Sequence, residues 1–205
     1  MRLWPSSCLH IYVILCGFFT ENGTALCVLL DEVRGVTQLH KVMYVVCAES
    51  SIIQTYNADT LEPFGEGIHV EGMKDPCDVV VCRDNRQLYI ADDECRIWRV
   101  SADDHSDQEK WLPTESTTDT FHVNKLSVTS RRLLVTSHWP PRLQEYSTTE
   151  RQLLRVVQLP WNVWSLYHGV ETARGTFVIG HEGTSKDKRQ HAVSKLILIN
   201  HAMLH

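Results

Sequence analysis

The sequence predicts an all-β protein, a β-propeller of four-stranded blades in which about four blades are present and the ring is incomplete. Three observations lead to this prediction: a segment that recurs about every 44 residues, several short strand-like runs in each copy, and the lack of a sustained helical period. A β-sandwich is the alternative, but a sandwich gives no reason for a constant long spacing between equivalent strands.

The repeat is clearest in a short apolar run that occurs once in each copy. Its four members are centred on Tyr44, Tyr89, Leu134 and Phe177, at spacings of 45, 45 and 43 residues. Runs of this length that are rich in Val, Ile, Leu and Tyr are typical of strands. We therefore expect these residues to occupy one equivalent strand in successive blades, with their side chains in the interfaces between blades.

Three further runs complete each predicted blade. One precedes the central run, at 36–39, 79–82, 126–128 and 169–171. Another follows it and contains the apolar residues Ile53, Ile97, Leu143 and Val193. The last lies between copies, at 67–70, 109–112 and 153–159. With turn signals between the runs, the blades are expected at approximately 26–70, 71–115, 116–160 and 161–205.

Residues 1–25 differ from the rest of the chain and predict a leader. Arg2 precedes an apolar run from Leu9 to Phe19, and small residues follow at 23–25. This is the three-part pattern of a secretory signal, and the run is shorter than the about 20 apolar residues that a membrane span needs. The alternative is a disordered leader without a targeting role. The protein is accordingly either secreted or cytoplasmic, and no membrane span is expected.

The composition argues against several classes of function. The chain has 205 residues and a formal net charge of −5, whereas nucleic-acid-binding domains carry a basic excess, so no nucleic-acid partner is expected. All seven cysteines lie before residue 96, and no two are spaced as CxxC. We therefore expect free thiols that behave as small hydrophobic side chains, and no metal site.

The second copy resembles the NHL or YVTN-type propeller repeat. That family has a proline before the inner strand, a Tyr-Val-Ala-Asp-like second strand and an Arg-Ile motif in the third strand. The matching segments here are Asp75-Pro76, the run from Leu88 to Asp92, and the run from Arg96 to Val100. The other copies depart from the pattern, because the positions assigned to Asp92 hold Cys47, Ser137 and Gly180.

This resemblance implies a propeller of roughly six blades, a fold that hosts many unrelated functions. Because this chain has room for about four blades, it forms either a closed four-bladed ring or a part of a larger ring, and we favour the partial ring. An open ring leaves unpaired edges, at the first strand after Leu26 and at the last strand near 195–199. We therefore expect self-association through these edges.

The candidate site is the mouth of the central channel. Each copy carries one polar residue just before its predicted inner strand: Arg34, Asp78, Lys125 and His168. Because symmetry brings equivalent positions together around the axis, we expect these four residues to converge. Two cations, a carboxylate and an imidazole suit a polar or zwitterionic ligand better than a divalent metal, which prefers several carboxylate or amide oxygens. The alternative is that these residues are solvated loop positions.

The function predicted first is a non-enzymatic binding or scaffold propeller that presents this mouth to a protein, a peptide or a small polar ligand. No GxSxG, phosphate-loop or kinase motif occurs in the sequence, and no cofactor is expected. The alternative is a propeller hydrolase or lyase in which His168 or His122 acts as the base near Asp78.

Overall fold

The fold was analysed in a computed structural model. The structure describes residues 18–19, 25–26, 32–92, 96–112, 122–138, 140–157, 159, 163, 165–172, 175–182 and 191–197. Every element of regular structure within these ranges is a β-strand. In the same ranges, no helix has the length and apolarity needed to cross a membrane. The predicted leader lies outside the described residues, except for β1 (Phe18–Phe19) and β2 (Ala25–Leu26), which pair with each other.

Four antiparallel sheets follow one another along the chain, and each is paired in chain order. The first contains β3 (Val33–Leu39), β4 (Val42–Cys47), β5 (Ile52–Asn57) and β6 (Ile68–His69). The second contains β7 (Pro76–Cys82), β8 (Gln87–Asp92), β9 (Ile97–Ser101) and β10 (Gln108–Leu112). The third contains β11 (Val123–Thr129), β12 (Arg132–Ser137), β13 (Arg142–Ser147) and β14 (Leu153–Val157). The fourth contains β15 (Ser165–Glu171), β16 (Thr176–Glu182) and β17 (His191–Ile197).

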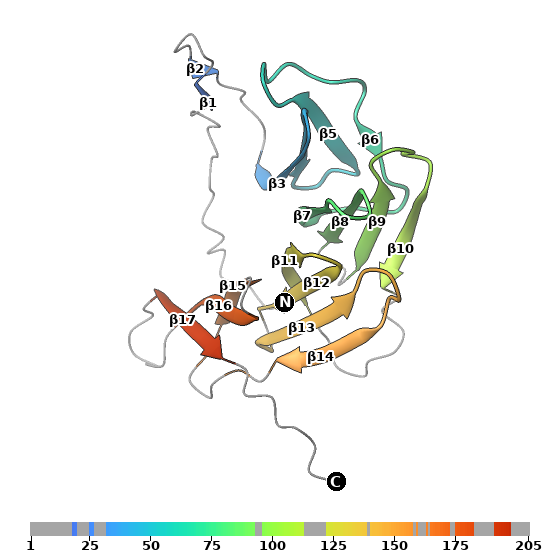
Figure 1. Ribbon diagram of the computed structural model, residues 1–205. Coiled ribbons are helices and arrows are strands. Elements are labelled where there is room, and N and C mark those ends of the chain that lie inside the picture. The colour runs from blue at the N-terminus through green and yellow to red at the C-terminus, as the bar shows by residue number, and fades with distance from the viewer. Residues whose placement is uncertain are drawn as a thin grey trace, which may run out of the picture.

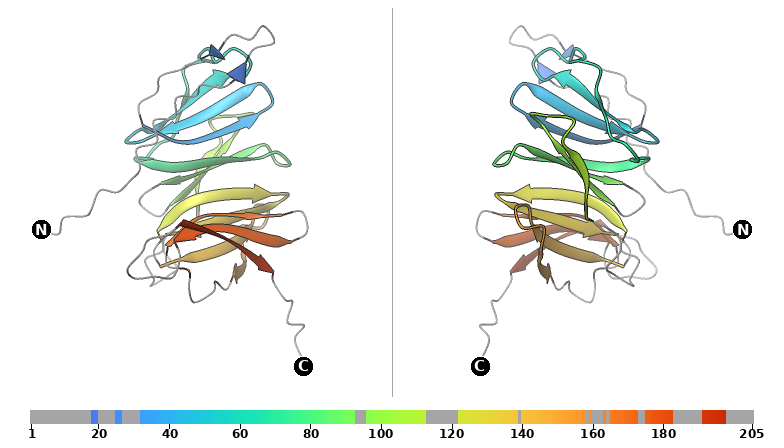
Figure 2. Two further views of the ribbon diagram at one scale, coloured as in Figure 1. Left: turned by 90° about the vertical axis from the view of Figure 1, so that its left-hand side faces the viewer. Right: turned by 90° about the vertical axis from the view of Figure 1, so that its right-hand side faces the viewer.

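The four sheets are the blades of a propeller. Figure 1 shows them along an arc, with β3, β7, β11 and β15 on its inner side, and Figure 2 shows them stacked in sequence when the molecule is viewed from the side. Consecutive inner strands pack against each other, from β3 to β7, from β7 to β11 and from β11 to β15. Within the described ranges, no comparable packing joins β15 back to β3. The prediction of an all-β propeller with about four blades in an incomplete ring is confirmed.

The register of the second strands corrects one alignment. The four predicted central residues do lie in equivalent strands, β4, β8, β12 and β16. They are Tyr44, Tyr89, Leu134 and Phe177. In the fourth blade, however, the pairing of β15 with β16 makes Val178 the equivalent of Tyr89 and Leu134, so the assignment of Phe177 is wrong by one residue. Because successive side chains of a strand point to opposite faces, Phe177 packs on the preceding blade. The same shift affects the end of β16, where the equivalent of Asp92 is His181 and not Gly180.

The hydrophobic core lies between the blades. Three clusters of buried side chains join the first blade to the second, the second to the third and the third to the fourth. At the second of these interfaces, the rings of Tyr89 and Trp111 meet edge to face with their centroids 5.1 Å apart. Alternating residues of each second strand supply the two faces, so the second and third blades each contribute to two interfaces.

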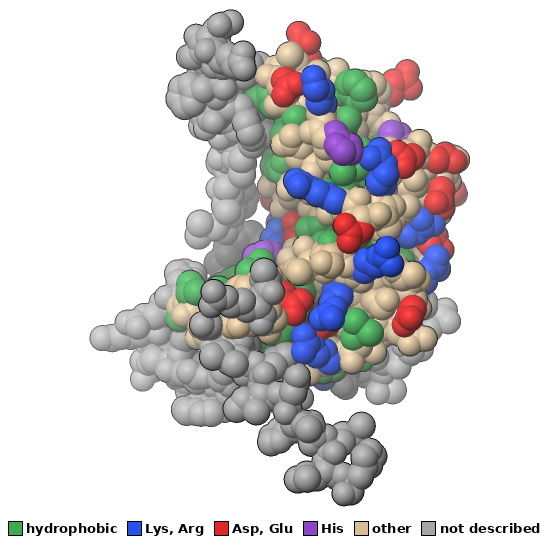
Figure 3. Space-filling view, in the orientation of Figure 1, with side chains coloured by type: hydrophobic (Ala, Val, Ile, Leu, Met, Phe, Trp, Pro, Cys, Tyr) green, Lys and Arg blue, Asp and Glu red, His purple; other side chains and the backbone are tan. Residues whose placement is uncertain are grey.

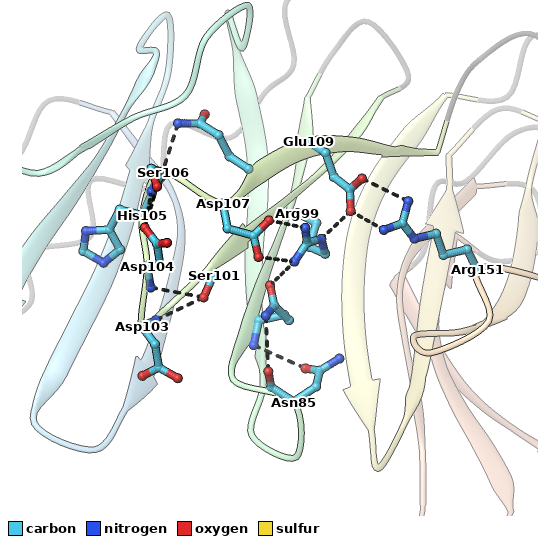
Figure 4. Close-up of polar contacts among 12 residues, drawn as sticks. Asn85, Arg99, Ser101, Asp103, Asp104, His105, Ser106, Asp107, Glu109 and Arg151 are labelled. Atoms are coloured by element: carbon cyan, nitrogen blue, oxygen red, sulfur yellow. Dashed lines mark hydrogen bonds and ion pairs between the residues drawn. The ribbon is translucent and has the colours of Figure 1, made fainter.

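Charged side chains connect the outer strands of neighbouring blades. Figure 3 shows acidic and basic side chains interspersed over the visible face. In the close-up of Figure 4, Arg99 of β9 contacts Asp107 and Glu109, and Glu109 also pairs with Arg151 of the third blade. These pairs are partly exposed and add only a modest stabilisation to the apolar interface beneath them.

Candidate functional site

The inner strand of every blade has an irregularity near its start. The pairing with the second strand skips one residue in each case: Arg34, Cys77, Asn124 and Tyr167. The residues that follow the skipped position are therefore equivalent: Gly35, Asp78, Lys125 and His168. A bulge of this kind re-aims the neighbouring side chains, here at the inner edge of the sheets. Three of the four predicted residues are equivalent, and Arg34 precedes the equivalent position by one residue.

The first blade has a glycine at this position because no side chain fits there. A Cβ on Gly35 would lie 2.7 Å from the backbone nitrogen of Val79 and 2.9 Å from Asp78 Oδ1. The guanidinium of Arg34 instead pairs with Glu32, with 2.7 Å between Nη2 and Oε1. A glycine inside a strand pattern is a sign of close backbone approach, and it is the one sequence signal that could have corrected this assignment.

Lys125 joins three blades at the centre of the arc. Its Nζ donates hydrogen bonds to the carbonyl oxygens of Arg34, at 2.9 Å, and Cys77, at 2.8 Å. The same nitrogen lies 3.6 Å from Asp78 Oδ1. The other carboxylate oxygen, Oδ2, accepts a hydrogen bond from the backbone N–H of Leu126 at 2.8 Å. The Asp78–Lys125 pair is therefore held in a fixed position by contacts from all three blades.

Burial decides the protonation behaviour of Asp78 and His168. Burial raises the pKa of the Asp78 carboxyl, and Lys125 and the Leu126 N–H offset part of this increase. His168 is exposed, but the protein around it shields the ring from part of the solvent. This partial desolvation disfavours the charged imidazole and is the main cause that lowers the pKa of His168. Asp78 raises the pKa of His168 and Lys125 lowers it further. The imidazole is consequently neutral at pH 7.

These three residues line one axial cavity. Its volume is about 610 Å³, and all four inner strands contribute to its wall. The polar part of the wall contains Asp78, Lys125 and His168, whereas valines such as Val36 and Val80 form much of the rest. No hydrogen bond or ion pair to the His168 side chain occurs within the described ranges, so its ring nitrogens are available to a ligand.

Further links between inner strands were not predicted from the sequence. Ser127 Oγ donates a hydrogen bond to the carbonyl oxygen of Gly169 at 2.8 Å, which ties the third blade to the fourth. The Cys77 thiol donates to the carbonyl oxygen of Val123 at 3.6 Å, and burial raises its pKa to about 12. A serine or cysteine inside a strand belongs to no recognisable sequence motif. The sequence therefore does not predict these hydrogen bonds, which form only because a particular strand of the next blade packs alongside.

Two other expectations concern metals and His122. Among the described residues, no group of three or more His, Cys, Asp or Glu side chains is arranged to hold a metal ion. His122 is exposed and directly precedes β11, and it is not among the residues that line the axial cavity. His168 is therefore the histidine that shares this cavity with Asp78.

Comparisons with known proteins support the fold. No protein-family profile and no curated protein matches the sequence. Among solved structures, hydrazine synthase from Kuenenia stuttgartiensis is similar with a TM-score of 0.59 and 14% identity, over 79% of this chain and 47% of that one. A nidogen/laminin complex is similar with a TM-score of 0.60 and 16% identity, over 78% of this chain and 61% of that one. The chain thus spans about half to three-fifths of the structures it matches, and at these identities the likeness concerns the propeller fold alone.

Proposed function

We propose that this protein is a non-enzymatic binding propeller whose axial cavity receives a polar group of a protein, a peptide or a small molecule. The observation that carries the proposal is one cavity shared by a fixed Asp78–Lys125 pair and His168. The His168 side chain is exposed and has no hydrogen bond or ion pair to any other described residue. The propeller architecture supports a binding or scaffold role in general terms. Finer features remain proposals, including the NHL type of the repeat, which the Asp75-Pro76 and Arg96-Ile97 matches support.

The chemistry of the cavity favours a polar or zwitterionic ligand with an apolar part. The hydrogen-bonding capacity of Lys125 is largely used by two carbonyl oxygens, so the pair acts on a ligand mainly through its dipole. His168 can donate from one ring nitrogen and accept at the other while it is neutral. The valine-lined wall suits a short aliphatic segment. No metal or cofactor is part of this proposal.

The test compares His168→Ala with a matched control, His69→Ala, which removes an exposed histidine remote from the cavity lining. Both variants and the wild type are dialysed against a defined mixture of amino acids, dipeptides and dicarboxylic acids. The retained compounds are then identified by mass spectrometry. We expect compounds that bind the wild type and His69→Ala but not His168→Ala. Identical retention by all three proteins would exclude the axial cavity as the binding site.

A hydrolase or lyase is the second candidate, because a neutral imidazole beside a carboxylate can act as a general base. We test it with an activated ester, p-nitrophenyl acetate, and with metal content measured with and without chelator. Turnover that is lost in His168→Ala would favour the enzyme, as would a stoichiometric divalent ion. A rate that is equal in wild type, His168→Ala and buffer would reject this candidate for ester substrates.

The secretory leader stays a prediction. If it is cleaved, the mature protein begins near Leu26 and lacks Asn22 of the Asn22-Gly23-Thr24 glycosylation sequon. N-terminal sequencing of protein expressed in a secreting cell tests this, and recovery of intact Met1 from the cytosol would contradict it.

A further inference from the structure

A second cavity lies between the first and second blades. Its volume is about 240 Å³, and none of its lining residues lines the axial cavity. The first blade contributes Tyr44, Thr55 and residues 64–67 to its wall, and the second blade contributes Ala102 and His105. The loop between β9 and β10 that carries His105 is drawn in Figure 4. The two blades therefore do not fill the space between them completely.

This cavity exists because the first blade has a glycine where the second has a tryptophan. In the pairing of the third and fourth strands, Ile68 is the equivalent of Leu112. Gly67 and Trp111 directly precede these two residues and so correspond to each other. The Trp111 ring fills the next interface, where it packs on Tyr89 with 5.1 Å between the ring centroids. A side chain at Gly67 would be strained, because its φ is +80° and an added Cβ would lie 3.0 Å from a backbone carbonyl oxygen of β5.

Both walls of the cavity are held in place by hydrogen bonds. The backbone N–H of Phe64 donates to the carbonyl oxygen of Thr55 at 2.8 Å, and the Thr55 hydroxyl donates to the carbonyl oxygen of Phe64. On the other wall, Gln108 Nε2 donates to the carbonyl oxygens of His69, at 3.1 Å, and His105, at 3.3 Å. The cavity is therefore preformed, which lowers the entropic cost of binding.

The tyrosine in this cavity is buried and its hydroxyl lacks a hydrogen-bond partner among the described residues. Tyr44 is the equivalent of Tyr89, whose hydroxyl accepts a hydrogen bond from Asn85 Nδ2 at 3.2 Å. Tyr44 is only 3% exposed, and burial raises the pKa of its phenol. A buried polar group without a partner is costly, so a ligand that bonds to this hydroxyl gains affinity from it.

The charges around the cavity favour a cation. Glu66 lines the cavity, is exposed, and makes no ion pair with another described residue. Arg86 and Asp103 both act on Tyr44, but they neutralise each other in an ion pair with 2.6 Å between Nη2 and Oδ1. Phe64 also lines the cavity and is 55% exposed, and the face of an aromatic ring attracts a cation. An unpaired carboxylate, a free phenol and an accessible ring together suit an ammonium group.

We propose that this cavity binds a lysine side chain of a peptide or partner protein. The aliphatic stem contacts Val42 and Ala102. The ammonium group donates a hydrogen bond to the Tyr44 hydroxyl, and the Glu66 carboxylate balances its charge. A space of about 240 Å³ receives a single side chain, so the main chain of the ligand stays outside, beside the exposed Phe64. This site is separate from the axial cavity and does not depend on the proposed function.

The experiment follows the methyl signal of Ala102 by NMR at pH 8, where imidazole side chains are uncharged. The probes are N-acetyl-lysine methylamide, its neutral analogue N-acetyl-norleucine methylamide, and n-butylamine. We expect the lysine derivative to shift the Ala102 signal saturably and to bind several-fold more tightly than the other two. The methyl signal of Ala91, which lies in the next interface, should not move. Tighter binding of n-butylamine would overturn the assignment to a peptide or protein.

Two substitutions test the chemistry of recognition. Tyr44→Phe removes only the hydroxyl and should weaken lysine binding about tenfold. Glu66→Gln removes only the charge and should weaken it about threefold. The matched controls are Tyr56→Phe, which removes a hydroxyl that donates to Gln54, and Glu62→Gln, an exposed acid outside the cavity wall. Both controls should bind the lysine derivative like the wild type.

Circular dichroism of each variant verifies that the fold is retained. If Tyr44→Phe fails to fold, Glu66→Gln still provides a test, since Glu66 is exposed. Three further results would overturn the proposal: no saturable shift of the Ala102 signal, equal affinity for the lysine and norleucine derivatives, or an equal effect of each substitution and its matched control.

Discussion

The second and fourth blades have the same pattern of residues but different surroundings. In the second blade both faces are covered, and Leu88, Tyr89 and Ile97 are inaccessible to solvent. In the fourth blade, Phe177 on one face is 0% exposed, whereas Val193 on the other face is 77% exposed and none of the described residues covers it. The comparison shows that the alternation within a repeat determines which residues form each face, whereas the neighbouring blades determine which face becomes a core.

The same contrast applies to the bulge position of the inner strand. In the second blade, Asp78 is buried and held by Lys125 and the Leu126 N–H. In the fourth blade, the equivalent His168 is exposed to the cavity. One position therefore holds a buried carboxylate between blades in the second blade and an exposed imidazole at the cavity wall in the fourth.

The largest effect is expected where the two blades differ most in packing. Tyr89→Ala should lower the free energy of unfolding by about 3–5 kcal/mol, because it removes a buried ring that packs against Trp111. Val178→Ala, at the equivalent position of the fourth blade, should cost about 1 kcal/mol or less. Urea denaturation measures both values. Equal costs would mean that the two positions are not equivalent or that Val178 is packed as tightly as Tyr89.

The next prediction concerns the bulge position. Asp78→Ala should destabilise the fold by about 2–4 kcal/mol, because it leaves the Lys125 ammonium and the Leu126 N–H without their carboxylate. His168→Ala should change stability by only about 0.5 kcal/mol, as for an exposed side chain. Thermal unfolding of the two variants provides the measurement. An Asp78→Ala variant as stable as the wild type would show that this pair does not hold the blades together.

A smaller effect is expected at the outer edge of the second blade. Glu109→Gln removes the ion pairs with Arg99 and Arg151 and should cost about 0.5–1 kcal/mol at low salt. The cost should shrink at high salt, since the pairs are partly exposed. Denaturation at two ionic strengths tests this, with Glu62→Gln, an exposed acid of the first blade, as the control. A cost that does not change with salt would indicate a packing effect.

The smallest effect is a pH dependence from His168. Its folded-state pKa lies below the ordinary value of about 6.5, so the unfolded chain binds the proton first as the pH falls. The stability that His168 contributes is complete above about pH 6.5 and decreases as the pH falls toward the folded-state pKa. The unfolding free energy of wild type should therefore fall more steeply than that of His168→Gln between pH 7 and 5. Parallel curves would contradict the lowered pKa.

Much of the fold could be predicted because it repeats. The 45-residue spacing of Tyr44, Tyr89 and Leu134 identifies equivalent strands without any knowledge of packing. The assignments that were wrong, Phe177 and Arg34, are each displaced by one residue. A bulge, or a turn shorter by one residue, changes the register without changing the apolar pattern, so that pattern does not reveal such a shift. For Arg34, the neighbouring Gly35 was the one sequence signal of it.

For the candidate site, the sequence identified Asp78, Lys125 and His168 but not how they are used. Only the tertiary structure shows that Lys125 reaches the carbonyl oxygens of two other blades, and that His168 remains open.

The apolar periodicity by itself determined that this chain forms blades, because side chains alternate between the two faces of a strand at any position in the fold. The three-dimensional arrangement decided which charges are consumed in holding the blades together, which histidine faces the cavity and which face of a blade is covered. The physical reason is that these properties depend on distances between strands that are 48 to 91 residues apart in the sequence, and such distances are set by packing and not by local sequence.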